Sequence, residues 1–169
     1  MAKYTLTTEQ ILDILAATPN RIAELTAPLD PTLFHTAPAN DAWSVNDVLS
    51  HLRGCADVWG DCIEKILTHD HPTIRAIDPV TWMKKTDYQQ QDFHKSLAAF
   101  TKQRHELLAR LRPLQPADWK RAATVTNTGI PRTNSIETYG IRLAVHERQH
   151  YRQFAKIVAA LQTRSDYSI

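Results

Sequence analysis

The sequence contains little glycine, only two cysteines and no long apolar run, and each shortage excludes a class of protein. Four glycines in 169 residues are too few for a turn-rich β architecture. Cys55 and Cys62 are seven residues apart, which on one helix is roughly 10 Å along the axis and too far for a disulfide. Free thiols are typical of a reducing compartment. No segment approaches the roughly 20 apolar residues of a membrane-spanning helix.

The charge is nearly balanced, because the sequence contains 20 Lys and Arg and 18 Asp and Glu, which gives a net charge of +2. No Lys- or Arg-rich run is present, so we expect no nucleic-acid partner. The N-terminal segment lacks the apolar core of a signal peptide, and we expect a cytoplasmic protein with no membrane attachment. We predict that residues 1–169, 43% of them apolar, form a single domain.

Apolar residues recur at helical spacing in four stretches, which predicts an all-α protein. The expected helices cover residues 8–26, 44–67, 86–111 and from 134 onward. Pro19 is expected to kink or split the first of them, and residues 119–131 alternate enough for a short extended piece or hairpin. Four amphipathic helices joined by long crossing loops are typical of a four-helix bundle.

The last predicted helix carries the sequence HERQH. His146 and His150 are four residues apart, so both rings point to one side and can hold one metal ion. On a wheel of about 100° per residue, both histidines and Glu147 fall on the apolar stripe around Leu143. Buried polar side chains need partners, so this cluster indicates either a metal ion or histidines that bond to backbone carbonyls.

The third ligand is expected upstream. HExxH is also the motif of zincin peptidases, in which that ligand usually follows downstream, but the 19 residues after His150 include no His or Glu. The candidate is His51, at the inner edge of the second helix, which Ser44 and Asp47 begin with the spacing of a capping box. Three neutral imidazoles with an open fourth position form a catalytic type of zinc, nickel or iron site.

Two segments of the chain, taken together, resemble those of a known family. The segment AWSVNDVLSHL, followed about ninety residues later by HERQH, is similar to the DinB-like (YfiT-like) family of metalloenzymes. The resemblance implies a four-helix bundle with long crossing loops, often a homodimer, and a divalent metal ion on His51, His146 and His150. Relatives include thiol S-transferases that use bacillithiol and a mycothiol-dependent maleylpyruvate isomerase.

Other polar residues have competing interpretations. Glu147, our candidate catalytic residue, could accept a hydrogen bond from a ligand histidine, act as a general base, or pair with a core arginine. Cys55, one turn after His51, is expected to be a small buried hydrophobe rather than a fourth ligand. His69 and His71 are expected to be a solvated pair in a loop.

These observations favour a metal-dependent enzyme with a small-molecule substrate. Following the resemblance, we expect a transferase in which a divalent ion (zinc, nickel or iron) activates a low-molecular-weight thiol cosubstrate for transfer to an electrophile. One alternative is a metal-dependent hydrolase that uses water, and another is a non-enzymatic metal-binding protein of a stress response. Thiol dependence of turnover separates the first two readings.

Overall fold

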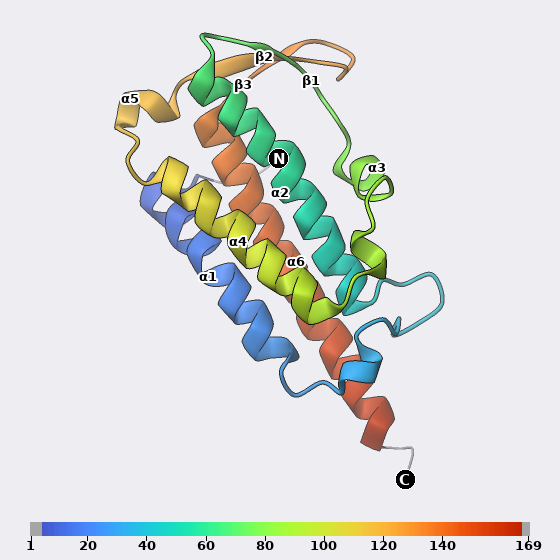
Figure 1. The fold of residues 1–169 in the computed structure, drawn as a ribbon. Coiled ribbons are helices and arrows are strands. Elements are labelled where there is room, and N and C mark those ends of the chain that lie inside the picture. Colours follow the sequence, from blue (N-terminus) through green and yellow to red (C-terminus); the bar gives the residue numbers. More distant parts are fainter. Residues whose placement is uncertain (1–4, 167–169) are drawn as a thin grey trace.

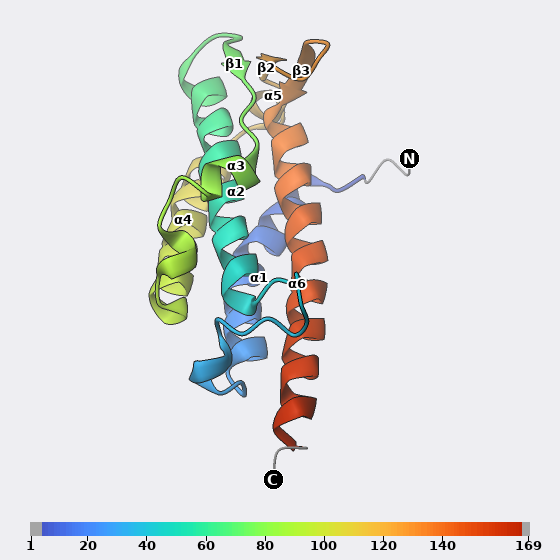
Figure 2. The same ribbon diagram turned by 90° about the vertical axis from the view of Figure 1, so that its right-hand side faces the viewer.

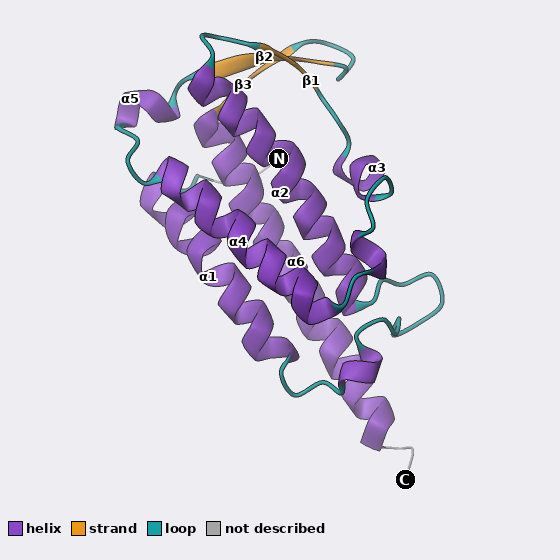
Figure 3. Ribbon diagram, in the orientation of Figure 1, coloured by secondary structure: helices purple, strands orange, loops and turns teal. Residues whose placement is uncertain are grey.

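The structure is a computed structural model that describes residues 5–166. Within that range four long helices form the predicted bundle (Figures 1 and 3): α1 (Thr8–Thr26), α2 (Val45–Thr68), α4 (Phe93–Leu111) and α6 (Ile136–Asp166). The shorter elements are η1 (Pro31–Leu33), β1 (Thr73–Arg75), α3 (Pro79–Met83), η2 (Tyr88–Gln90), α5 (Pro116–Trp119), β2 (Ala122–Thr126) and β3 (Arg132–Ser135).

The bundle has an arrangement that requires long connections. Helices α1 and α2 each pack against both α4 and α6, so the consecutive helices α1 and α2 lie at diagonal corners. In Figure 1, α2 and α4 run in the same direction, from the lower end of the bundle to the upper end. The chain therefore has to return along the bundle between them, which the predicted crossing loop allows.

The structure differs from the predicted helices at three places. Pro19 does not split α1, which is continuous around this buried proline, because packing of its apolar face outweighs the lost backbone hydrogen bond. The third long helix begins at Phe93 rather than near Thr86, since Asp92 accepts a hydrogen bond from the amide of Lys95 and caps it. The last begins at Ile136 rather than Asn134, which belongs to β3.

A small sheet closes one end of the bundle (Figure 2). The predicted extended piece is confirmed as β2, which pairs antiparallel with β3, a strand that lies beyond the predicted residues 119–131. Strand β1, which was not predicted, pairs parallel with β2 and makes the strand order β1-β2-β3. The long connection between α2 and α4 is thereby fixed at its start.

One carboxylate makes several of the hydrogen bonds that tie the later part of that connection to α2. Asp57 accepts hydrogen bonds from Trp82 Nε1 (2.9 Å) and the Tyr88 hydroxyl (2.8 Å), and it also accepts one from Gln103 Nε2 on α4. One side chain thus joins α2, α4 and the segment between them.

None of the helices in the described part of the chain combines the length and apolarity that a membrane crossing requires.

The core consists of two apolar clusters with a polar layer between them. One cluster includes Ile63, Leu108 and Leu143, and the other includes Leu52 and Phe154. Between them lie side chains that are polar although they are almost completely buried: Thr18 of α1, Arg104 of α4 and Glu147 of α6. The candidate site lies at this same level of the bundle.

Candidate metal centre

The two helices that carry the histidines are neighbours. Helix α2 begins with the predicted capping box, in which Ser44 Oγ accepts from the amide of Asp47 and the Asp47 carboxylate accepts from the amide of Ser44. His51 lies in the second turn and is 7% exposed. It faces α6, where His146 and His150 are half-buried. The predicted orientation of all three rings towards the interior is consistent with this burial.

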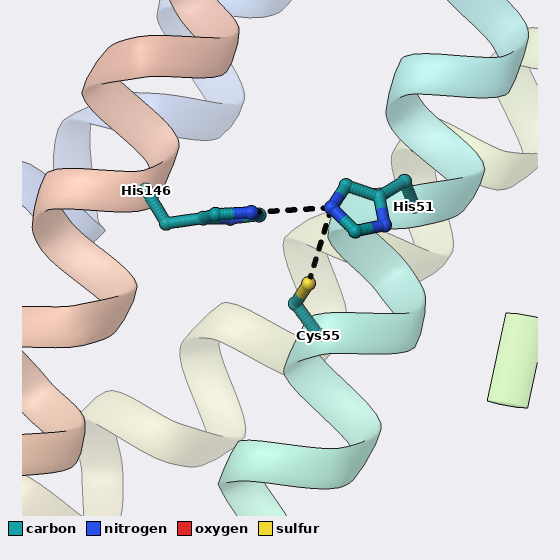
Figure 4. Close-up of side chains that lie close together, drawn as sticks. All are labelled: His51, Cys55 and His146. Atoms are coloured by element: carbon teal, nitrogen blue, oxygen red, sulfur yellow. Dashed lines mark hydrogen bonds between the residues drawn. The ribbon is translucent and has the colours of Figure 1, made fainter. Parts of the chain in front are cut away.

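The three imidazoles meet at their Nε2 atoms. His51 Nε2 lies 3.1 Å from His146 Nε2, and His146 Nε2 lies 3.0 Å from His150 Nε2. Figure 4 shows His51 and His146 pointing towards each other across the gap between α2 and α6. Residues that are 95 positions apart in the sequence are therefore brought to one point, as the sequence predicts.

Cys55 belongs to this cluster, which corrects its interpretation as an ordinary buried hydrophobe. Its Sγ lies 3.6 Å from His51 Nε2 (Figure 4). The ligand atoms that all lie within 4.8 Å of one another are those of His51, Cys55 and His146, so this mutual grouping is two histidines and a cysteine rather than three histidines. The cause is local, because four residues on a helix place Cys55 on the same face as His51.

Burial keeps the imidazoles neutral. Desolvation, with a contribution from the neighbouring His150, lowers the pKa of His51 to about 4. The same cause, together with both neighbouring histidines, lowers the pKa of His146 to about 3. Burial also lowers the pKa of His150 and raises the pKa of Cys55 to about 12. At neutral pH the cluster is thus three uncharged rings and a thiol.

Hydrogen bonds among the rings cannot satisfy these nitrogens. Each neutral imidazole Nε2 offers either one N–H or one lone pair, yet His146 Nε2 faces two other ring nitrogens. Nδ1 of His51 and Nδ1 of His146 are buried and have no hydrogen-bond partner within the described residues. A cation between the Nε2 atoms would bind all three lone pairs, so these residues fit a metal ion.

Gln153 is a functional candidate that the sequence reasoning missed. Its Oε1 lies 2.7 Å from His150 Nδ1 and accepts a hydrogen bond when that nitrogen is protonated. This tautomer leaves the lone pair of His150 Nε2 facing His146. Partners of this kind orient metal ligands. The three-residue spacing from His150 to Gln153 was the available signal.

Two tryptophans flank the cluster. The ring of Trp43 is nearly parallel to His150, with centroids 6.4 Å apart, and the ring of Trp59 meets His146 edge-on at 5.1 Å. A hollow of about 370 Å³ lies beside Trp43 and His150, and another of about 270 Å³ lies beside His146. His150 and His146 each line one of these surface hollows, and Trp43 lines the first of them.

Glu147 pairs with Arg104 rather than with an imidazole. Its carboxylate accepts a hydrogen bond from Arg104 Nη2 in an ion pair whose members are both 1% exposed. Burial raises the pKa of Glu147, while Arg104 and Thr18 lower it. Of the three partners that the sequence left open, the structure supplies the core arginine, and the catalytic role remains a prediction.

The other histidines lie outside the cluster. All five are exposed: His35, His69, His71, His94 and His105. His69 bonds locally within the end of α2, and His71 contacts the Thr124 hydroxyl. The prediction that His69 and His71 form a solvated pair agrees with their exposure.

Comparisons with known proteins agree with this architecture. A family model for the DinB superfamily matches residues 14–154. The solved structure of YfiT from Bacillus subtilis superimposes with a TM-score of 0.76 at 18% sequence identity, covering 98% of this chain and 93% of YfiT. YfiT is described as a probable metal-dependent hydrolase with an unusual four-helix bundle topology. No curated protein sequence matches the chain significantly.

Proposed function

The chain belongs to the DinB superfamily, and from this membership and its clustered imidazoles we propose that it is a metal-dependent enzyme. Its ion is held by His51, His146 and His150. The observation that carries the proposal is the pair of Nε2 contacts, 3.1 Å from His51 to His146 and 3.0 Å from His146 to His150.

The spacing of these donors supports the proposal. Tetrahedral zinc with Zn–N bonds of about 2.0–2.1 Å places neighbouring nitrogens about 3.3–3.4 Å apart. The two observed contacts are shorter by only a few tenths of an ångström. Neutral imidazole is the form that binds metals, and the lowered pKa values of His51 and His146 keep that form at neutral pH. Zinc, nickel and iron all accept such donors.

We favour hydrolysis as the reaction, because YfiT shares the fold and is described as a probable metal-dependent hydrolase. When bound, the ion supplies Lewis acidity that polarises a substrate and lowers the pKa of a ligand. Gln153 holds the His150 ring in its metal-binding tautomer. Trp43 and Trp59 restrict water at the cluster and offer apolar contacts to a small substrate. Transfer of a low-molecular-weight thiol is the alternative reaction.

Metal stoichiometry tests the site. We expect about one zinc ion per chain in the wild type and a marked loss in His51→Ala, His146→Ala and His150→Ala. His105→Ala is the matched control, since His105 is exposed on α4. Undiminished binding in all three site variants would refute the proposed ligands.

A substrate screen on the zinc-loaded protein, run with and without a low-molecular-weight thiol, tests the reaction. Turnover of esters or amides without added thiol supports hydrolysis, and turnover that requires the thiol supports transfer instead. Zinc binding without either activity would favour the non-enzymatic alternative.

A further inference from the structure

The two cysteines of the chain have different surroundings, although both are buried on α2. Cys62 is a member of the first apolar cluster, beside residues such as Ile63 and Ile66. Cys55 is 1% exposed but belongs to neither apolar cluster. Its sulfur faces the Nε2 atom of His51 instead, and this is the nitrogen that points to His146. Apolar packing, the usual role of a buried cysteine, therefore accounts for Cys62 better than for Cys55.

The separation of the sulfur from His51 matches that of two ligands of one ion. A tetrahedral ion with one Zn–S bond of about 2.3 Å and Zn–N bonds of about 2.0–2.1 Å places sulfur about 3.5 Å from each nitrogen. The observed separation of Cys55 Sγ from His51 Nε2 is 3.6 Å. The sulfur also lies within 4.8 Å of the donor nitrogen of His146. In Figure 4 the sulfur points from α2 towards the space between the two rings.

We propose that Cys55 is a fourth donor to the metal ion, and that an external ligand has to compete with its sulfur for the open position. This inference rests on the proposed metal site and concerns its regulation. Sites with four protein ligands are closed, whereas catalytic sites keep one position open. Because Cys55 is buried and His150 is half-buried, the sulfur contributes from the core side. A thiolate also favours zinc and copper(I) among the metals that imidazoles accept.

Cobalt(II) reports directly on sulfur ligation. We would load the wild type with cobalt(II) and record the near-ultraviolet thiolate-to-cobalt charge-transfer band. The band is expected in the wild type and in the control Cys62→Ala, and it is expected to be absent from Cys55→Ala, which should still bind one cobalt ion through its imidazoles. If Cys55→Ala does not fold, the bands of the wild type and Cys62→Ala alone still decide whether Cys55 ligates.

Azide then tests the competition. Azide should bind cobalt-loaded Cys55→Ala at least about tenfold more tightly than it binds the wild type or Cys62→Ala, as followed by visible absorption. A wild type that binds cobalt without a thiolate band, or equal azide affinities, would overturn this inference and leave the three-histidine site intact. A wild type that binds neither cobalt nor zinc would overturn both proposals.

Discussion

The buried ion pair between Arg104 and Glu147 gives the sharpest test of how this bundle is stabilised. Both side chains are 1% exposed, and the pair is incompletely hydrogen-bonded. Arg104 Nε, Arg104 Nη1 and Glu147 Oε2 are buried and have no partner within the described residues. We would replace each residue by methionine, alone and together.

Each single variant is expected to have a lower unfolding free energy than the wild type. The double variant is not expected to show the sum of these two losses. Removal of one member of a buried pair leaves the other charge uncompensated and costs about 3–5 kcal/mol of unfolding free energy. The double variant removes both charges and also the three unpaired atoms, each of which costs about 1–3 kcal/mol when buried. Arg104→Met/Glu147→Met should therefore be about as stable as the wild type or more stable, because apolar replacement of buried pairs is often neutral or better.

Denaturant unfolding of the metal-free proteins at neutral pH measures these differences in unfolding free energy. Zinc stoichiometry measures whether the metal site is still intact. The double variant should keep its zinc, since Glu147 bonds to Arg104 rather than to an imidazole. If the unfolding free energy lost in the double variant equals the sum of the two single losses, the coupling between Arg104 and Glu147 is refuted. Loss of zinc from a folded double variant would show that Glu147 supports the ligands after all.

Three further outcomes follow from the geometry, and a fourth, the homodimer, follows from the family resemblance. Metal-free protein should lose stability as the pH falls from 6.5 towards 4, because burial lowers the pKa values of His51 and His146 in the folded state. The unfolded chain therefore binds protons at a higher pH than the folded chain does. Equal denaturant midpoints at about pH 7 and about pH 5 would contradict this. Gln153→Ala should weaken zinc binding about 10–100-fold at unchanged stoichiometry, as titration calorimetry can measure. Asp57→Ala should speed amide exchange in residues 76–92, whereas unchanged rates would show that its hydrogen bonds are dispensable. Light scattering should detect a homodimer at micromolar concentration, and a monomer would exclude it.

The features that were predictable from the sequence depend on local spacing. A four-residue interval places His146 and His150 on one face of any α-helix, and the capping box of Ser44 and Asp47 forms within a single turn. These signals require no knowledge of the neighbouring helices. The meeting of His51 with His146 was predictable because both lie on apolar stripes that have to face the same core.

The features that were not predictable depend on distant partners. Strand β1 is only three residues long and exists because it pairs with β2, about fifty residues further on. The four-residue spacing places Cys55 beside His51, but only the approach of α6 brings a second imidazole, that of His146, to its sulfur. The partner of Glu147 is likewise on another helix, α4, so the sequence could name an arginine as one alternative but could not choose it.

The location of the polar layer explains why we expect the site to survive loss of the ion pair. Helices α2 and α6 contribute to the apolar cluster on each side of the layer, through Ile63 and Leu143 in one and Leu52 and Phe154 in the other. These contacts fix the alignment of the two helices above and below the ligands, because well-packed apolar side chains resist sliding past one another. The alignment of His51 with His146 therefore does not require Arg104. The ion pair and the proposed metal centre share one level of the bundle, yet we expect that each can be removed without the other.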